Sequence, residues 1–68
     1  MKVQIEKGLE AAGKFPYGFM NKENKQFLMD NVGKQFNAVR HSINAYELDA
    51  ELTDGKAPLV HIYNAREV

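Results

Sequence analysis

The sequence predicts an all-β domain: a small five-stranded barrel with a short helical turn between its third and fourth strands. Glycine and proline recur along the chain and separate short segments, a spacing typical of barrels and meanders rather than helical bundles. Polar and apolar side chains alternate within several of these segments, as they do in half-buried strands. The 68 residues form a single domain, residues 1–68, which buries only about 60% of its unfolded surface.

Three short segments in the first half of the chain are predicted to be strands. Residues 2–6 alternate between polar and apolar side chains, which predicts the first strand. Residues 14–20 predict the second, because aromatic rings occupy alternate positions there. Residues 26–29 form a short apolar run after a polar turn, and we expect this run to pair back onto the second strand as a hairpin.

The C-terminal part of the chain predicts another hairpin. Apolar and acidic side chains alternate over residues 46–52, and an apolar strand follows at residues 58–63. A three-residue loop with Gly55 in the left-handed conformation sets Val60 opposite Leu48 and keeps both on the apolar face. A two-residue turn would slip the register by one residue and turn the apolar face of the last strand to water. We therefore expect the three-residue loop.

Residues 30–45 allow two interpretations. Asn21 can cap a helix here. Six apolar side chains fall on one helical stripe: Leu28, Val32, Phe36, Val39, Ile43 and Tyr46. One long helix here predicts an α+β fold, β-α-β-β, with one helix over a three-stranded sheet. Gly33 and a run of weak helix formers oppose that helix. A short helical turn inside a long connection gives the all-β barrel instead.

An aromatic row is the most informative functional feature of the sequence. On a strand, Phe15, Tyr17 and Phe19 share one face, and lysines flank them in the sequence. Rings that face solvent beside cations can stack unpaired bases, so this row predicts a platform for single-stranded RNA or DNA. If the same rings point inward, they fill the core of the domain.

Two segments, Pro-Tyr-Gly-Phe-Met at residues 16–20 and Gln-Phe-Leu-Met at residues 26–29, resemble motifs of the bacterial cold-shock proteins, a family of small five-stranded OB-fold barrels. Residues 16–20, Pro-Tyr-Gly-Phe-Met, are similar to the family's Gly-aromatic-Gly-Phe-Ile motif on the second strand. Residues 26–29, Gln-Phe-Leu-Met, are similar to its Val-Phe-Val-His motif on the third strand. The resemblance implies an OB-like barrel in which Tyr17, Phe19 and Phe27 stack the bases of a single strand.

The sequence departs from the cold-shock pattern at several positions of the platform. Ile5 stands where the family has a tryptophan on its first strand, and Met29 replaces the histidine of its third strand. We expect Lys14 and Lys25 to steer phosphates, and Phe15 to extend the stacking surface together with Met29. The residues predicted to bind nucleic acid are Lys14, Phe15, Tyr17, Phe19, Lys25, Phe27 and Met29.

The composition argues against several other function classes. Nine basic and nine acidic side chains give a formal net charge of zero, which disfavours a duplex-DNA binder. The chain has no cysteine and no phosphate-binding glycine motif. His41 has no partner at a spacing that predicts contact, and a cross-strand pair of His61 with Glu47 is interpreted as ordinary strand pairing. We therefore expect no enzyme activity, no cofactor and no metal. No segment is apolar enough to cross a membrane, and we expect a cytoplasmic protein.

A non-catalytic protein-binding module is the alternative function. Glu47, Asp49 and Glu51 form an acidic row on the predicted strand over residues 46–52. Alternate strand residues lie about 7 Å apart, too far to share one metal ion directly. A solvated strand face is the simplest interpretation of the row, but the row can also dock a basic partner. Such a domain would act as a small phage-type inhibitor or adaptor of host machinery.

Overall fold

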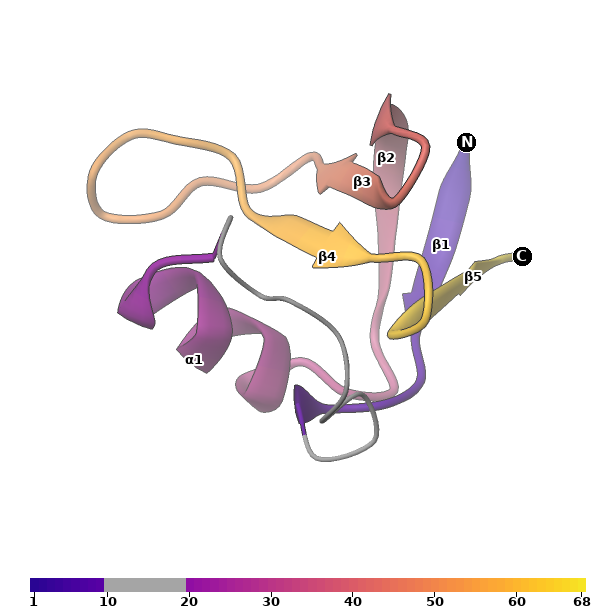
Figure 1. The fold of residues 1–68 in the computed structure, drawn as a ribbon, viewed down its shortest axis with the longest axis horizontal. Helices are drawn as coiled ribbons and strands as arrows, with labels where there is room; N and C mark the ends of the chain where they lie inside the picture. Colours follow the sequence, from indigo (N-terminus) through magenta and orange to yellow (C-terminus); the bar gives the residue numbers. More distant parts are fainter. Residues whose placement is uncertain (10–19) are drawn as a thin grey trace.

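The computed structural model describes residues 1–9 and 20–68, and it shows a small, mostly-β domain with one helix (Figure 1). In chain order the elements are β1 (Lys2–Ile5), α1 (Lys22–Asp30), β2 (Gln35–Ser42), β3 (Ala45–Leu48), β4 (Leu59–His61) and β5 (Ala65–Glu67). The strands form one antiparallel sheet of five in the order β4-β3-β2-β1-β5. Within the described ranges no pairing joins the end strands β4 and β5, so the sheet is open. The expectation of a mostly-β domain with five strands is confirmed.

Strand β2 connects the two halves of the sheet. Its first residues pair with β1, where Phe36 lies opposite Val3. Its later residues pair with β3, where Arg40 lies opposite Tyr46, and a register shift follows before Ser42. Because one strand serves both partners, β1 with β5 and β3 with β4 extend the sheet on its two sides.

Helix α1 begins where the sequence provides an N-cap. Asn21 has an extended backbone, and its Oδ1 accepts a hydrogen bond from the Asn24 N–H at 2.8 Å. This bond satisfies one of the donors that a helix leaves free in its first turn, so the expectation that Asn21 caps a helix is confirmed. The predicted strand over residues 26–29 is wrong, because this run lies inside α1. A four-residue apolar run has no period of its own, and the cap upstream decides its conformation.

Both interpretations of residues 30–45 are wrong. The helix ends at Asp30, and Gly33 then adopts a φ of 91°, a left-handed conformation that glycine enters without steric cost. Its N–H donates to the Ile5 carbonyl at 2.6 Å, which directs the chain into β2 beside β1. The helix therefore lies between the first and second strands, and not between the third and fourth.

The C-terminal hairpin has the predicted faces but a different register. Val60 lies opposite Tyr46, two residues from its predicted partner Leu48, so the apolar face is kept. The Leu48 N–H donates to the Pro58 carbonyl at 2.9 Å, but Pro58 has no N–H to return, and the ladder ends there. Strand β3 thus stops at Leu48 and a longer loop follows. Gly55 has a φ of 82°, so its predicted left-handed conformation is confirmed.

The core lies between the sheet and helix α1. Alternate residues of the strands point into it, and α1 contributes Leu28, which is completely buried. Each such aliphatic side chain stabilises the fold by about 1.5–3 kcal/mol. The largest fully buried apolar side chains of the described residues are Ile5, Leu28, Leu48, Val3, Val60 and Pro58.

Buried Asn64 joins the end of β1 to the chain that enters β5. Its side chain has no exposed surface, and its Nδ2 donates to the carbonyls of Lys7 at 3.0 Å and Gly8 at 3.1 Å. Its own carbonyl accepts the N–H groups of Glu6 and Lys7. A single asparagine therefore replaces ladder bonds at the point where the strands diverge.

Candidate functional site

Four of the residues predicted to bind nucleic acid lie outside the described residues. These are Lys14, Phe15, Tyr17 and Phe19. The orientation of the aromatic row therefore stays a prediction. The next residue along the chain, Met20, is buried in the hydrophobic core.

The other three predicted binding residues lie on α1, and not on a strand. Phe27 is half-buried and packs on Phe36, with ring centroids 5.5 Å apart and ring planes inclined by 50°. Met29 is 43% exposed, and its sulfur accepts a hydrogen bond from the Leu9 N–H at 3.3 Å. On a helix, residues two positions apart in the sequence, such as Phe27 and Met29, are separated by about 200° of rotation. Phe27 and Met29 therefore do not form a common flat surface, while Lys25 is half-buried on the same helix.

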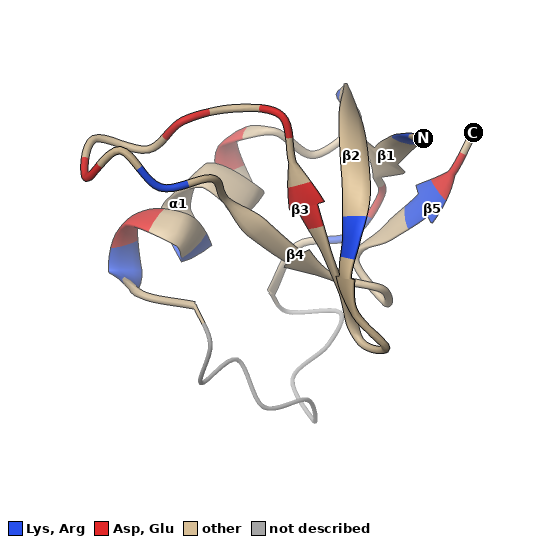
Figure 2. Ribbon diagram, turned by 90° about the horizontal axis from the view of Figure 1, so that it is seen from above, with Lys and Arg blue, Asp and Glu red and all other residues tan. Residues whose placement is uncertain are grey.

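The acidic row lies at the end of β3 and in the loop that follows it. Figure 2 shows acidic segments on β3 and along the loop between β3 and β4. Glu47 is half-buried, whereas Asp49 and Glu51 are exposed. The Asp49 N–H donates to the Asn37 carbonyl at 2.8 Å, which holds the start of this loop against β2.

These three carboxylates differ from the other acidic side chains that the structure describes. Five acidic side chains have partners within the chain: Glu6 with Arg66, Glu23 with Thr53, Asp30 with Gln26, Asp54 with the Lys56 N–H, and Glu67 with Arg40. In residues 1–9 and 20–68, the carboxylates of Glu47, Asp49 and Glu51 take part in no such hydrogen bond or ion pair. Among the acidic side chains of residues 1–9 and 20–68, Glu47, Asp49 and Glu51 are thus the ones without a partner inside the described chain.

Two of these carboxylates line an open hollow of about 320 Å³, which we call the β3 hollow. Its lining includes Asn37, Val39, Glu47, Asp49, Ala50 and Ala57. Val39 pairs with Glu47 across β2 and β3 and is 57% exposed, an unusual state for a valine on a central strand. The lining of the hollow therefore combines the exposed apolar side chain of Val39 with two acidic residues, Glu47 and Asp49.

A second hollow of about 250 Å³, the α1 hollow, lies between helix α1 and the loop after β3. Its lining includes Glu23, Phe27, Asp30, Glu51, Leu52 and Thr53. The Thr53 N–H donates to Glu23 Oε1 at 3.0 Å, and the Thr53 hydroxyl donates to Glu23 Oε2. These two bonds hold the loop against the helix and fix the width of the hollow.

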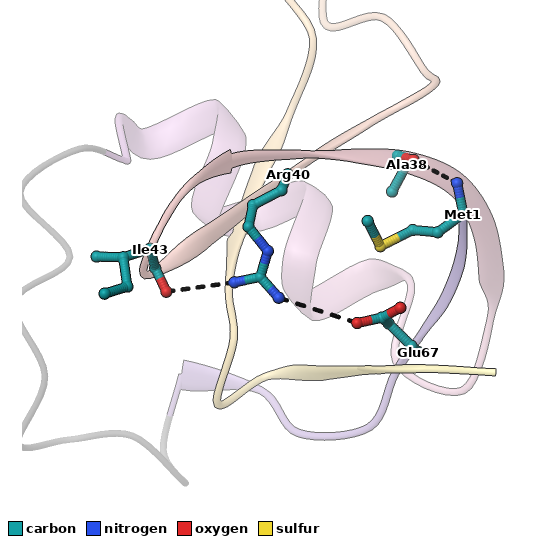
Figure 3. A network of polar contacts seen from close by, with 5 residues as sticks. All are labelled: Met1, Ala38, Arg40, Ile43 and Glu67. Carbon is teal, nitrogen blue, oxygen red and sulfur yellow. Dashed lines mark hydrogen bonds and ion pairs between the residues drawn. The ribbon is translucent and has the colours of Figure 1, made fainter.

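Arg40 lies elsewhere on the sheet and is held by several groups (Figure 3). Its guanidinium lies 5.3 Å from the centre of the Tyr46 ring, 3.9 Å from a Glu67 carboxylate oxygen, and 3.4 Å from the Ile43 carbonyl oxygen. Arg66 similarly contacts Glu6 at 2.8 Å. Both arginines of the described chain therefore already have carboxylate partners.

No group of three metal-ligating side chains comes together in the described residues. In the same part of the chain, no helix is long and apolar enough to cross a membrane. Comparison with protein-family models, with curated proteins and with solved structures finds no match to this chain.

The sequence indicated the acidic row by its spacing, but it did not indicate the hollows. The β3 hollow depends on Val39, which sequence analysis placed on a helical stripe, and on Ala57, which carried no signal. The α1 hollow depends on the bonds between Glu23 and Thr53, residues 30 positions apart. A local pattern cannot reveal a contact of that separation.

Proposed function

We propose that this chain is a non-catalytic binding module that docks a basic segment of a protein partner at the β3 hollow. The observation that carries the proposal is the set of three neighbouring carboxylates that have no partner among the described residues, two of which belong to residues lining an open hollow. Complementary charge steers such a partner and fixes its register. The exposed side chain of Val39 supplies apolar area for the stem of a lysine or arginine.

The magnitudes favour a weak, reversible complex. Each exposed ion pair contributes about 0.2–1 kcal/mol, and burying 100 Å² of apolar surface contributes about 2.5 kcal/mol. These terms total at most about 5.5 kcal/mol before the cost of ordering the partner is subtracted, so we expect a dissociation constant in the millimolar range. A tighter complex would need a larger contact than these carboxylates and this hollow provide.

Fluorescence anisotropy with a labelled basic peptide tests this proposal. The probe is a dodecapeptide of alternating lysine and alanine, and its counterpart replaces each lysine with glutamate. We expect the double variant Glu47→Gln/Asp49→Asn to weaken binding of the basic probe by about fivefold, equivalent to about 1 kcal/mol. The control Glu67→Gln removes a carboxylate on β5, at the other end of the sheet order, and should bind like the wild type. Equal affinity in all three proteins would refute the docking site.

Single-stranded nucleic-acid binding is the second candidate function. The observation that favours it is the row of alternate rings in residues 15–19 next to Lys14, together with the resemblance to cold-shock proteins. The acidic lining around Phe27 disfavours phosphates at that ring, so this function depends on the row alone. Titration of labelled oligo-dT with the wild type and with Tyr17→Ala/Phe19→Ala tests it, and equal affinity would rule out the platform.

The finer part of the fold prediction, closure into an OB-like barrel, is likewise a proposal. Only residues 62–64 separate β4 from β5, the two ends of the sheet order. Such a short link keeps the two end strands near each other, which supports a strongly curved sheet. Amide exchange that protects the outer edges of β4 and β5 equally would support closure.

A further inference from the structure

We infer that the α1 hollow binds the side chain of an arginine from the same partner segment that docks at the β3 hollow. The inference rests on the proposed function and adds the identity of one partner residue. The first observation is the apolar part of the hollow lining. The Phe27 ring packs on Phe36 with the ring planes inclined by 50°, and Phe27 also lines the hollow together with Leu52.

The charges around this apolar surface favour a cation. Glu51, Glu23 and Asp30 line the hollow, and neither lysine nor arginine is among its described lining residues. Asp30 accepts a hydrogen bond from Gln26 at 2.8 Å, and Glu23 binds Thr53. Among the described residues that line the hollow, Glu51 is therefore the one whose two carboxylate oxygens both lack a partner within the described part of the chain.

An arginine side chain suits a hollow with an aromatic ring and a carboxylate better than a lysine side chain does. A guanidinium is flat, so it can stack on the face of an aromatic ring while its edge pairs with a carboxylate. It is also more weakly hydrated than an ammonium group, which lowers the cost of entering a partly apolar hollow. The hollow offers the required pair, an aromatic ring in Phe27 and an unpaired carboxylate in Glu51.

One extended partner segment can reach both hollows. Asp49 lines the β3 hollow and Glu51 lines the α1 hollow, and these two residues are separated by one residue in the loop. Two residues of extended chain span at most about 7 Å. Alternate side chains of an extended partner lie about 7 Å apart on one face, so basic residues at positions i and i+2 can span the backbone separation of Asp49 and Glu51.

The hollow is formed before the partner arrives. The bonds between Glu23 and Thr53 fix the loop on α1. A second turn within the loop, in which the Leu52 N–H donates to the Lys56 carbonyl at 2.9 Å, fixes its far side. Binding to a preformed site does not have to order the loop, which saves conformational entropy.

A double-mutant cycle with matched peptides tests the inference. The probe is the labelled peptide Ala-Lys-Ala-Arg-Ala-Lys-Ala, and its partner replaces arginine with citrulline, which has nearly the same shape and no charge. With the wild type we expect the citrulline peptide to bind about fivefold more weakly. With Glu51→Gln we expect the affinities of the two peptides to differ by less than about twofold, because the carboxylate that pairs with the guanidinium is absent.

Two further variants make the outcome unambiguous. Phe27→Leu keeps apolar packing on Phe36 but removes the ring, and it should reduce the preference for arginine over citrulline; Glu67→Gln should retain that preference in full. Equal binding of the two peptides to the wild type, with sensitivity to Glu47→Gln/Asp49→Asn preserved, would overturn the arginine site and leave the proposed docking function intact. Absence of binding by either peptide would overturn both.

Discussion

The side chain of Asn24 pairs with both backbone polar groups of Leu59. Its Nδ2 donates to the Leu59 carbonyl at 2.6 Å, and its Oδ1 accepts the Leu59 N–H at 2.8 Å. Leu59 opens β4, an end strand of the sheet. The amide thus acts as a substitute for a neighbouring strand and joins α1 to the sheet, and it protects an edge that would otherwise be open to pairing with other chains.

Replacing Asn24 should destabilise the domain strongly. Asn24→Ala leaves the N–H and carbonyl of half-buried Leu59 without these partners, and each such loss costs about 1–3 kcal/mol. We expect a loss of about 2–4 kcal/mol in the free energy of unfolding, measured by urea denaturation. Asn21→Ala, which removes the N-cap at the start of the same helix, should cost only about 1 kcal/mol. Similar losses in the two variants would contradict the role of Asn24.

The effect of substituting Gly55 on stability should depend on the backbone conformation there and not on the room for a side chain. Its φ is 82°, and a Cβ added there would meet nothing within 4 Å. We expect Gly55→Ala to cost about 1–2 kcal/mol in unfolding free energy, because alanine is strained in the left-handed region. Gly55→Asn should cost less, since asparagine tolerates that region better. If both variants are as stable as the wild type in thermal unfolding, the turn does not require positive φ.

Glu67→Gln should leave the stability almost unchanged. Its pair with Arg40 spans 3.9 Å, and the two side chains are 46% and 56% exposed. Solvent screens such a pair, so we expect a change of less than about 0.5 kcal/mol in unfolding free energy. Urea denaturation checks this value, and a larger loss would disqualify Glu67→Gln as the control in the peptide titrations.

The helical content should be small and confined to one segment. Backbone carbon chemical shifts should show helix over residues 22–30 and extended structure over residues 35–42. Gly33, at a φ of 91°, is the residue that separates the two segments. Helical shifts that continue through residues 31–42 would contradict this fold.

The features that sequence analysis predicted correctly are local. Strand β1 and the faces of the C-terminal hairpin follow from alternation, and the cap at Asn21 follows from its residue type. Strand β2 was missed because its apolar residues, from Phe36 to Val39, also fit a helical stripe. The two-residue error in the hairpin register has a different cause. Alternation decides only which face a residue occupies, so Val60 keeps the same apolar face whether it lies opposite Leu48 or opposite Tyr46.

The candidate site was predictable from the sequence only in part, because only its local features follow from a sequence pattern. The spacing of Glu47, Asp49 and Glu51 was visible in the sequence. What makes them a candidate site is a set of distant contacts: Val39 beside Glu47, and Glu23 beside Thr53. Those contacts depend on how β2 and α1 pack, which the sequence pattern left undecided.

The most direct test of the account is a nitrogen–proton NMR titration of the uniformly labelled protein with the alternating lysine–alanine dodecapeptide. Docking at the β3 hollow should produce saturable shifts of the backbone amides of Val39, Glu47, Asp49 and Ala50, which line it. The same titration of Glu47→Gln/Asp49→Asn should show much smaller shifts. Shifts that are absent, or that occur only outside residues 37–57, would contradict the claim that the acidic row docks a basic partner.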